Sequence, residues 1–391
     1  MITYSEAKEL LKENTLTFKT EVISIDQALG RVLAQDIIAD RDYPPFNRSA
    51  MDGYVVNTEW FKAIDQKKCS IQGTCFAGEE YLKEIDQTKA LKIMTGAPVP
   101  NGLDAIIRVE DSEPSCDTVS FNITTLNPFT NIAKQGEDAK KGQVVIEKNK
   151  TIDLGNIGLL ATVGSSNIEV YKQPSISIIT TGTEIKNVTD DVENHQIRNS
   201  NVYNLINGLK KVGLDVAFQC HIPDDQKALN EAIVKGLNSD ILILTGGVSM
   251  GDADFVPQLL RENGVEQIFH KIAMKPGKPV WFGKSNQTAV FGLPGNPLSA
   301  ANCLQLIVKP YLDYCHNKNA TQNWVKLIAD HEIKAGRIDR FFPFKLNEGL
   351  LSVNNFNGSG DILAQEGTLG IAYLKKGKDY TKGSQIDCLF V

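Results

Sequence analysis

The hydrophobic positions in the second half of the chain predict strands that alternate with helices. Residues 175–180 (SISIIT) and 241–244 (ILIL) are short apolar runs with little polar alternation, as in strands buried on both faces. Between them, a helical stripe ends at Gly213 and consists of Val202, Leu205, Ile206, Leu209 and Val212. This alternation predicts a parallel sheet that helices cover on both faces, in a three-layer α/β domain.

The flanking regions have a different, mostly β-like pattern. Residues 5–15 predict a short helix with Ser5 as its N-cap. Short β-rich runs broken by Gly, Pro and Asn turns fill the chain as far as about residue 138, and the tail from about 317 is β-like again. The fold class is therefore α/β plus β. Further expected elements of the α/β region are a strand over 214–219, a helix ending near 236 and a last helix over 298–312.

Composition and charge exclude several classes of protein. The chain has 391 residues, of which 42% are apolar and 23% charged, as in globular proteins. Because 41 Lys+Arg face 47 Asp+Glu, the net charge of −6 argues against binding to nucleic acid through phosphates. No apolar run approaches the roughly 20 residues of a membrane helix, and the first residues lack the pattern of a secretion signal. We expect a cytoplasmic protein with neither nucleic-acid nor membrane partners.

The cysteines and histidines do not form a pattern typical of zinc binding or disulfide frameworks. The seven cysteines include no C-x2-C pair, and His331-Glu332 has no second histidine in register. We expect reduced thiols, most of them buried.

Three glycine-rich loops each follow a predicted strand of the parallel sheet, at 181–184 (TGTE), 245–251 (TGGVSMG) and 292–297 (GLPGNP). Loops that follow parallel strands emerge together at the carboxyl edge, where open α/β folds bind ligands. The last loop leads straight into a helix, whose N-terminus attracts anions. Each loop alone could be an ordinary turn, but the three together favour a nucleotide or oxyanion site. None has the spacing of a dinucleotide fingerprint or a P-loop.

A basic turn and several carboxylates accompany these loops. Three lysines stand beside stiff prolines within residues 271–279, which suits capture of phosphate or another oxyanion, although a solvated basic loop is the alternative. Glu184 and Asp224 follow strands at the same edge and are candidate Mg²⁺ ligands, because Mg²⁺ beside phosphates takes one or two protein carboxylates. Asp224 or Asp225 could instead cap the next helix, as could Asp254.

Six motifs together make the chain resemble the molybdopterin molybdenumtransferases, the family of MoeA and the gephyrin E domain. The resemblance spans essentially the whole chain, and the motifs follow in the family's order. They are SAMDGY at 49–54 behind PPF at 44–46, MTGAPVP at 94–100, GED at 136–138, TGGVS at 245–249, KPGKP at 275–279 and LPGNP at 293–297.

The resemblance implies an elongated homodimer, a four-part subunit and a reaction. Molybdate would be inserted into adenylylated molybdopterin in the presence of Mg²⁺, with release of AMP, in a cleft between one subunit's α/β and C-terminal domains and the other subunit's inserted module. Further partners would be the molybdopterin adenylyltransferase and molybdoenzyme chaperones. The expected parts are a helical and extended linker domain (1–40 and 139–172), an inserted β-rich module (41–138), the α/β domain (173–316) and a C-terminal β-barrel-like domain (317–391).

Carried over position by position, the resemblance also implies site residues. The catalytic positions are Asp52, Thr95, Asp138, Asp254 and Lys271. The metal positions are Glu184 and Asp224. The substrate-binding positions are Gly246, Gly247, Ser249, Lys275, Lys278, Pro294, Gly295, Asn296, Ser299 and Ser359.

The chain departs from the family pattern at a few places. Asn47-Arg48 replaces the usual acid and amide before Asp52, and Ala253 stands where an aromatic residue is common. The arginine expected early in the C-terminal domain could be Arg337 or Arg340. Two alternative functions remain at this point: a molybdopterin adenylyltransferase, against which the long flanking segments argue, and a non-catalytic peptide-binding scaffold like gephyrin.

Overall fold

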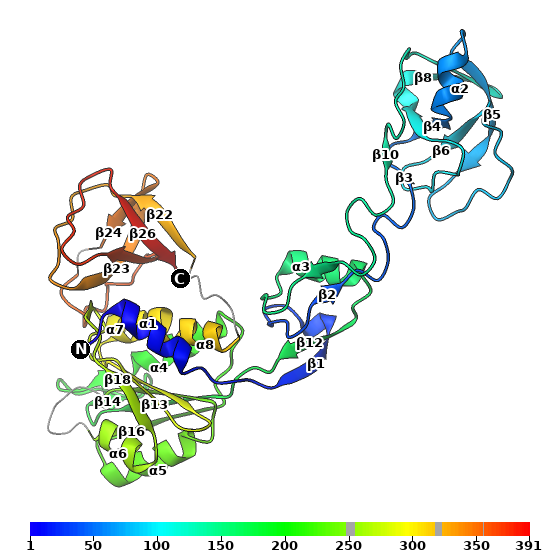
Figure 1. Ribbon diagram of the computed structural model, residues 1–391. Coiled ribbons are helices and arrows are strands. Elements are labelled where there is room, and N and C mark those ends of the chain that lie inside the picture. Colours follow the sequence, from blue (N-terminus) through cyan, green and yellow to red (C-terminus); the bar gives the residue numbers. More distant parts are fainter. Residues whose placement is uncertain (248–254, 317–322, 355) are drawn as a thin grey trace.

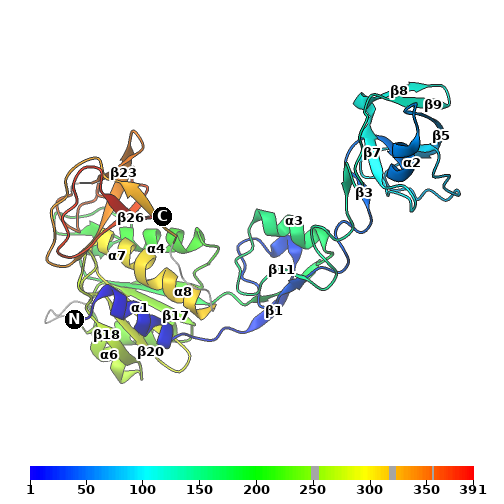
Figure 2. The same ribbon diagram turned by 45° about the horizontal axis from the view of Figure 1, so that its top comes forward.

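The computed structural model shows an elongated chain and describes residues 1–247, 255–316, 323–354 and 356–391. The α/β body and the C-terminal sheet lie together at one end, and a narrow linker body leads to a β-rich module at the other end (Figures 1 and 2). None of the helices in these ranges is long and apolar enough to cross a bilayer.

The α/β body contains the expected parallel sheet. The strand order is β16-β13-β17-β21-β20-β18; the first four strands are parallel to one another, and β20 is antiparallel to both of its neighbours, β21 and β18. The strands are β13 (Ile176–Thr181), β16 (Phe218–Ile222), β17 (Ile241–Thr245), β18 (Glu266–His270), β20 (Trp281–Lys284) and β21 (Ala289–Leu293).

Helices cover both faces of this sheet because alternate strand residues point to opposite sides. Ile178 and Ile243 belong to the core under α1, α4, α7 and α8, whereas Ile179 and Leu242 belong to the core under α5 and α6. The helices are α1 (Tyr4–Glu13), α4 (Ser200–Lys210), α5 (Gln226–Gly236), α6 (Val256–Glu262), α7 (Pro297–Cys303) and α8 (Lys309–Cys315).

Three expected elements differ in detail from the structure. The first helix is capped by Thr3 instead of Ser5, because Thr3 and Glu6 form a capping box. The strand expected over 214–219 begins at Phe218, since Leu214 is still hydrogen-bonded to the end of α4 and pairing with β13 starts only at Phe218. The expected last helix contains a π-helical turn (Leu304–Val308) between α7 and α8.

The linker body is formed by segments from both sides of the inserted module. β1 (Thr20–Ser24) pairs with β12 (Asn167–Tyr171), and β2 (Ile37–Ile38) pairs with β11 (Val144–Ile146). A 3₁₀ turn (Ile25–Gln27) and α3 (Leu154–Thr162) complete it, around a separate hydrophobic core.

The module is a six-stranded sheet in the order β7-β4-β6-β5-β9-β8. It also contains α2 (Thr58–Ala63), which the hydrophobic pattern did not predict. A short pairing of β3 (Arg48–Ser49) with β10 (Ile132–Ala133) lies where the module joins the linker body. The sheet consists of β4 (Gly53–Val56), β5 (Lys68–Cys75), β6 (Ala90–Ile93), β7 (Ala105–Arg108), β8 (Ser112–Ser115) and β9 (Thr118–Phe121).

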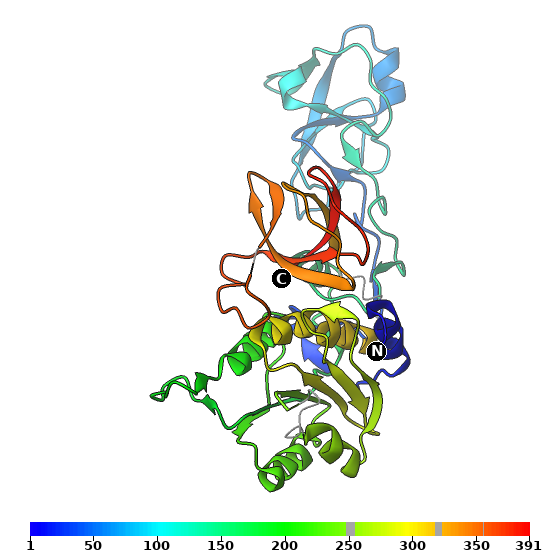
Figure 3. The same cartoon turned by 90° about the vertical axis from the view of Figure 1, so that its left-hand side faces the viewer.

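A strand of the basic turn ties the C-terminal sheet to the α/β body. β19 (Met274–Lys275) leaves the α/β body and pairs with β23 (Asp339–Asn347) as the edge of the C-terminal sheet. Figure 3 shows that sheet standing over the helices of residues 297–315. Its other strands are β22 (Trp324–Ile328), β24 (Leu350–Val353), β25 (Gly370–Leu374) and β26 (Gln385–Phe390).

Candidate functional site

The three glycine-rich loops meet at the carboxyl edge of the sheet. Thr245 Oγ1 donates a hydrogen bond to Pro294 O over 3.2 Å, which joins the loops after β17 and β21. Gly246 has a φ of +93°, and a Cβ there would lie 2.3 Å from the backbone oxygen of Thr181, the last residue of β13. Only glycine fits this position, because its backbone touches a neighbouring backbone and has a left-handed conformation.

Asn201, which the sequence interpretation missed, holds two of these loops in place. Its side chain is 8% exposed, and its Nδ2 donates to Gly295 O over 2.7 Å and to Thr245 Oγ1 over 3.1 Å. Its Oδ1 is buried and has no partner among the described residues. The available signal was an asparagine in the first turn of a helix that follows one of the glycine loops.

A cavity of about 200 Å³ lies between the basic turn, the start of α7 and the C-terminal domain. Lys275 and Lys278 are exposed at its wall, and Ser299 in the first turn of α7 is 4% exposed. Asn296 Nδ2 donates to Ser359 Oγ over 2.8 Å and so closes the cavity against the C-terminal domain. Two lysines and a helix N-terminus give this cavity a local positive charge in a chain of net charge −6.

Contacts within the basic turn and with the C-terminal sheet fix the conformation of the turn that carries these lysines. Met274 pairs with Asp339 in the C-terminal sheet, and Ile272 N donates to Lys278 O over 3.0 Å. Gly277 has a φ of +108°, and a Cβ there would lie 2.6 Å from the Met274 side chain. Burial strongly raises the pKa of the Cys303 thiol, so it stays protonated and donates to Gly277 O.

Glu184 and Asp224 lie together at the same edge, beside the first loop. Asp224 accepts hydrogen bonds from Thr183 N and Oγ1 over 3.1 and 3.2 Å and from Thr181 Oγ1 over 3.3 Å. The neighbouring Asp225, and not Asp224, caps α5. Burial lowers the pKa of nearby His221, and the charges of Glu184 and Asp224 act in the opposite direction.

Two carboxylates match what Mg²⁺ takes from a protein when phosphates and water complete its coordination. Asp224 is already a hydrogen-bond acceptor, but each carboxylate oxygen has a further lone pair for a cation. No group of three or more His, Cys, Asp or Glu side chains is placed to hold a metal within the ranges that the structure describes.

Three catalytic candidates, Asp52, Thr95 and Asp138, do not join this cavity within one chain. Thr95 N and Oγ1 both donate to Asp52 Oδ1 over 2.7 Å, which lowers the pKa of Asp52. Both residues belong to the module at the far end of the chain (Figure 1). Asp138 lies at the joint between module and linker body, where its N–H donates to Tyr43 O over 2.9 Å.

Four further candidates belong to residues 247–271 of the α/β region: Lys271, Asp254, Ser249 and Gly247. Lys271 belongs to the α/β body, where its N–H donates to Val280 O, but it does not line the 200 Å³ cavity. Asp254 and Ser249 lie outside the described residues. Gly247, at a φ of +61°, lies in the loop after β17 beside Thr181.

Of the two candidate arginines, Arg340 lies closer to the basic turn. It pairs in register with Lys275 and lines with it a second hollow of about 410 Å³ in the C-terminal domain. Its guanidinium donates to Lys334 O, while its buried Nε has no partner within the described ranges. Arg337 lines neither hollow.

Comparisons with known protein families agree with this architecture. Residues 177–314 match the family described as "Probable molybdopterin binding domain", which gives the class of the α/β body. Residues 2–164 match the "MoeA N-terminal region (domain I and II)". The chain belongs to the MoeA family of molybdopterin molybdenumtransferases.

Individual relatives extend over most of the chain. It is 33% identical to the molybdopterin molybdenumtransferase of Haemophilus influenzae over 92% of this chain and 91% of that protein. It is 32% identical to the enzyme of the same name from Staphylococcus aureus, over 93% of this chain and 89% of that protein. The crystal structure of the molybdopterin biosynthesis moeA protein from Pyrococcus horikoshii superposes with a TM-score of 0.87 at 26% identity, covering both chains completely.

Proposed function

We propose that the chain inserts molybdate into adenylylated molybdopterin and releases AMP, in the biosynthesis of the molybdenum cofactor. The printed name of its relatives, molybdopterin molybdenumtransferase, supports this reaction. The observation that carries the proposal is the single cavity formed by Lys275, Lys278, the start of α7 and Ser359.

This cavity would hold molybdate. A tetrahedral dianion needs positive charge and hydrogen-bond donors on several sides, and lysine ammonium groups with a helix N-terminus provide both. Lys275 and Lys278 would supply the charge, and the Ser299 and Ser359 hydroxyls would orient the oxyanion. Charge compensation also matters because the second substrate carries phosphates, which would repel molybdate.

Glu184 and Asp224 would hold Mg²⁺ at the edge of the glycine loops. When bound, Mg²⁺ would polarise a phosphoryl oxygen of the nucleotide substrate. The chain's own part is to fix the carboxylates: Thr181 and Thr183 orient Asp224 through three hydrogen bonds.

A second copy of the chain would complete the site. Asp52 and Thr95 lie in the module, far from the cavity of their own chain (Figure 1). In a homodimer, the module of one subunit would bring Asp52, Thr95 and Asp138 to the α/β body of the other. Such a site, shared between two subunits, requires that the module residues and the cavity residues lie at opposite ends of each chain.

The direct test incubates the purified chain with adenylylated molybdopterin, Mg²⁺ and molybdate and follows AMP release. We expect release that depends on molybdate, and Lys275→Ala should raise the molybdate concentration needed by about tenfold or more while nucleotide binding changes little. Lys210→Ala, at an exposed position at the end of α4, is the matched control. Unchanged molybdate dependence in Lys275→Ala would refute the assignment of the cavity, and formation of adenylylated pterin from ATP would identify an adenylyltransferase instead.

A further inference from the structure

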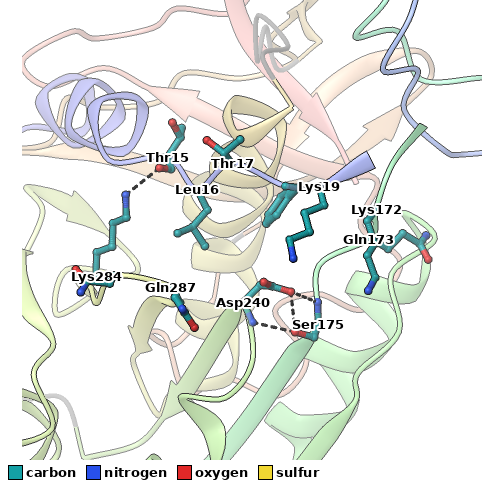
Figure 4. A pocket seen from close by; sticks show the side chains of 12 residues that line it. Thr15, Leu16, Thr17, Lys19, Lys172, Gln173, Ser175, Asp240, Lys284 and Gln287 are labelled. Carbon is teal, nitrogen blue, oxygen red and sulfur yellow. Dashed lines mark hydrogen bonds between the residues drawn. The ribbon is translucent and has the colours of Figure 1, made fainter. Parts of the chain in front are cut away.

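A larger pocket lies at the opposite edge of the sheet from the glycine loops. It has a volume of about 640 Å³ and lies beside the amino ends of β13 and β17, where Ser175 and Asp240 precede the two strands (Figure 4). The two chain segments that join the α/β body to the linker body, Thr15–Lys19 and Lys172–Ser175, form one wall. Lys284, Asn286 and Gln287 of the β20–β21 hairpin contribute to the lining as well.

The charges that line this pocket are mostly positive. Lys19 and Lys172 extend from the two connecting segments toward Asp240 and Ser175, and Lys284 reaches Thr15 on the other side (Figure 4). Lys284 Nζ donates to Thr15 O over 2.9 Å, which leaves two of its three donors for a ligand. Neither Lys19 nor Lys172 has an ion pair among the residues that the structure describes.

The one acid in the lining is already engaged. Asp240 Oδ2 accepts hydrogen bonds from both Ser175 N and Ser175 Oγ over 2.7 Å, and Asp240 N donates back to Ser175 Oγ over 2.9 Å. This carboxylate therefore fixes the start of β13. The hydrogen bonds from neutral Ser175 do not cancel its charge, so three ammonium groups and one carboxylate leave two positive charges unmatched in the lining. A ligand that compensates them must itself be an anion of more than one charge.

The other lining groups suit a phosphate compound. Thr17, Asn286 and Gln287 offer hydroxyl and amide donors around the lysines. The volume is within the range of sites for small molecules. Leu16 and Phe18 add an apolar side, which a free inorganic ion would not use but an organic phosphate would.

We propose that this pocket binds a small, multiply charged phosphate compound at the root of the linker body. The site is independent of the proposed reaction, since it lies at the other edge of the sheet. Lys172 N donates to Lys19 O over 2.8 Å, so the two connecting segments are already paired there. A ligand that contacts Lys19, Lys172 and Lys284 together would bridge these segments and the α/β body.

The experiment titrates inorganic pyrophosphate into the full chain by calorimetry. The Lys275→Ala/Lys278→Ala background removes the lysines of the 200 Å³ cavity, so that pyrophosphate binding there does not contribute. In this background we expect one equivalent of pyrophosphate per chain, and Lys19→Ala/Lys172→Ala should weaken its binding by about tenfold or more because two charge-assisted contacts are lost. A parallel titration with GDP distinguishes an organic phosphate, which should bind more tightly through Leu16 and Phe18, from an inorganic one.

Lys150→Ala is the matched control, an exposed lysine on the linker body that does not line the pocket. It should bind pyrophosphate as the background does. Absence of binding in the background, equal affinity after Lys19→Ala/Lys172→Ala, or an equal loss in Lys150→Ala would each overturn the proposal. Thermal unfolding of every variant shows that the compared chains are folded.

Discussion

Asn201 shows how much of the site depends on a residue that touches no expected substrate group directly. One buried amide holds the loops after β17 and β21. Its neighbour Asn207 lies on the same helix, but its Nδ2 donates to Tyr203 O at the surface. The two asparagines therefore lie on the same helix but differ in burial and in what they support.

We expect Asn201→Ala to lower the free energy of unfolding by about 1–3 kcal/mol, because the buried Thr245 Oγ1 and the partly buried Gly295 O would both lose their donor. AMP release should fall as well, since the loop before α7 would lose its anchor. Asn207→Ala should change stability by less than about 0.5 kcal/mol. Urea denaturation measures both, and similar effects of the two substitutions would contradict the role given to Asn201.

At the scale of single elements, the glycine loops depend on space as well as on backbone conformation. Gly246 and Gly142 both have left-handed φ angles, +93° and +83°. A Cβ at 246 would lie 2.3 Å from Thr181 O, whereas nothing lies within 4 Å of a Cβ at 142. Comparing substitutions at these two glycines therefore separates the cost of backbone strain from the cost of a steric clash.

Gly142→Ala should cost about 1 kcal/mol, the strain of a left-handed alanine. Gly246→Ala should cost clearly more and reduce AMP release strongly, because the loops after β13 and β17 must move apart. Thermal unfolding and the AMP assay of the two variants provide the comparison. If the two variants lost equal stability, the close approach of these loops would not matter.

Lys309 at the start of α8 gives an element-scale prediction that depends on pH. Burial first, and then the charge of Lys211, lower its pKa from 10.5 to about 8, against the opposing effect of Asp313. Between about pH 8 and 10.5 the unfolded chain therefore binds a proton that the folded chain does not. The free energy of unfolding falls as the pH drops through this window and stays lower below it.

Lys309→Met should stabilise the chain at pH 7 by about 1–2 kcal/mol, less than the full linkage value because the amine is partly solvated. The gain should shrink as the pH rises above about 8 and vanish near 10.5. Urea denaturation at pH 7 and pH 10 tests this expectation, with the exposed Lys210→Met as control. A gain that does not depend on pH would mean that packing, and not charge, is responsible.

Sequence patterns predicted the elements whose hydrophobic period is strong. Ile241–Leu244 is a strand where the pattern put it, because burial on both faces leaves a continuous apolar run. The helix expected to close at Gly213 is present but ends at Lys210, and Val212, the last position of the predicted stripe, is exposed beyond it. The start of β16 was missed because strand pairing, not composition, determines it. The cap of α1 was placed two residues late because Ser5 and Thr3 are both good caps, and only Thr3 has glutamate at the third position.

At the scale of the whole molecule, the candidate residues fall into two groups. Motifs indicated which residues belong to a site, and the parallel sheet predicted that the glycine loops would meet. The separation of Asp52 from Lys275 within one chain was expected only from the resemblance to the family, because hydrophobic patterns do not determine how separate bodies are arranged. The sequence also left the choice between Arg337 and Arg340 open. Arg340 lies beside Lys275 because β19 joins the C-terminal sheet, and the hydrophobic pattern did not predict that pairing.

Mixed dimers test the proposed exchange between subunits. Asp52→Ala and Lys275→Ala chains should each be nearly inactive alone. In a mixed dimer one of the two composite sites contains both wild-type groups, so we expect about half the specific AMP release of the wild-type dimer. Mixtures that stay inactive although mixed dimers form would show that each chain uses its own module.

The neck of the inserted module has a consequence for how such chains can diversify. Tyr43 and Ala139 are neighbours across an antiparallel pair, with Tyr43 N donating to Ala139 O over 2.7 Å, and β3 with β10 continues this pairing outward. The chain therefore enters and leaves the module through two neighbouring segments. If the module were deleted, a short hairpin turn could connect these two segments directly. Recombination could replace this end of the polypeptide as a cassette and leave the remaining hydrophobic cores untouched.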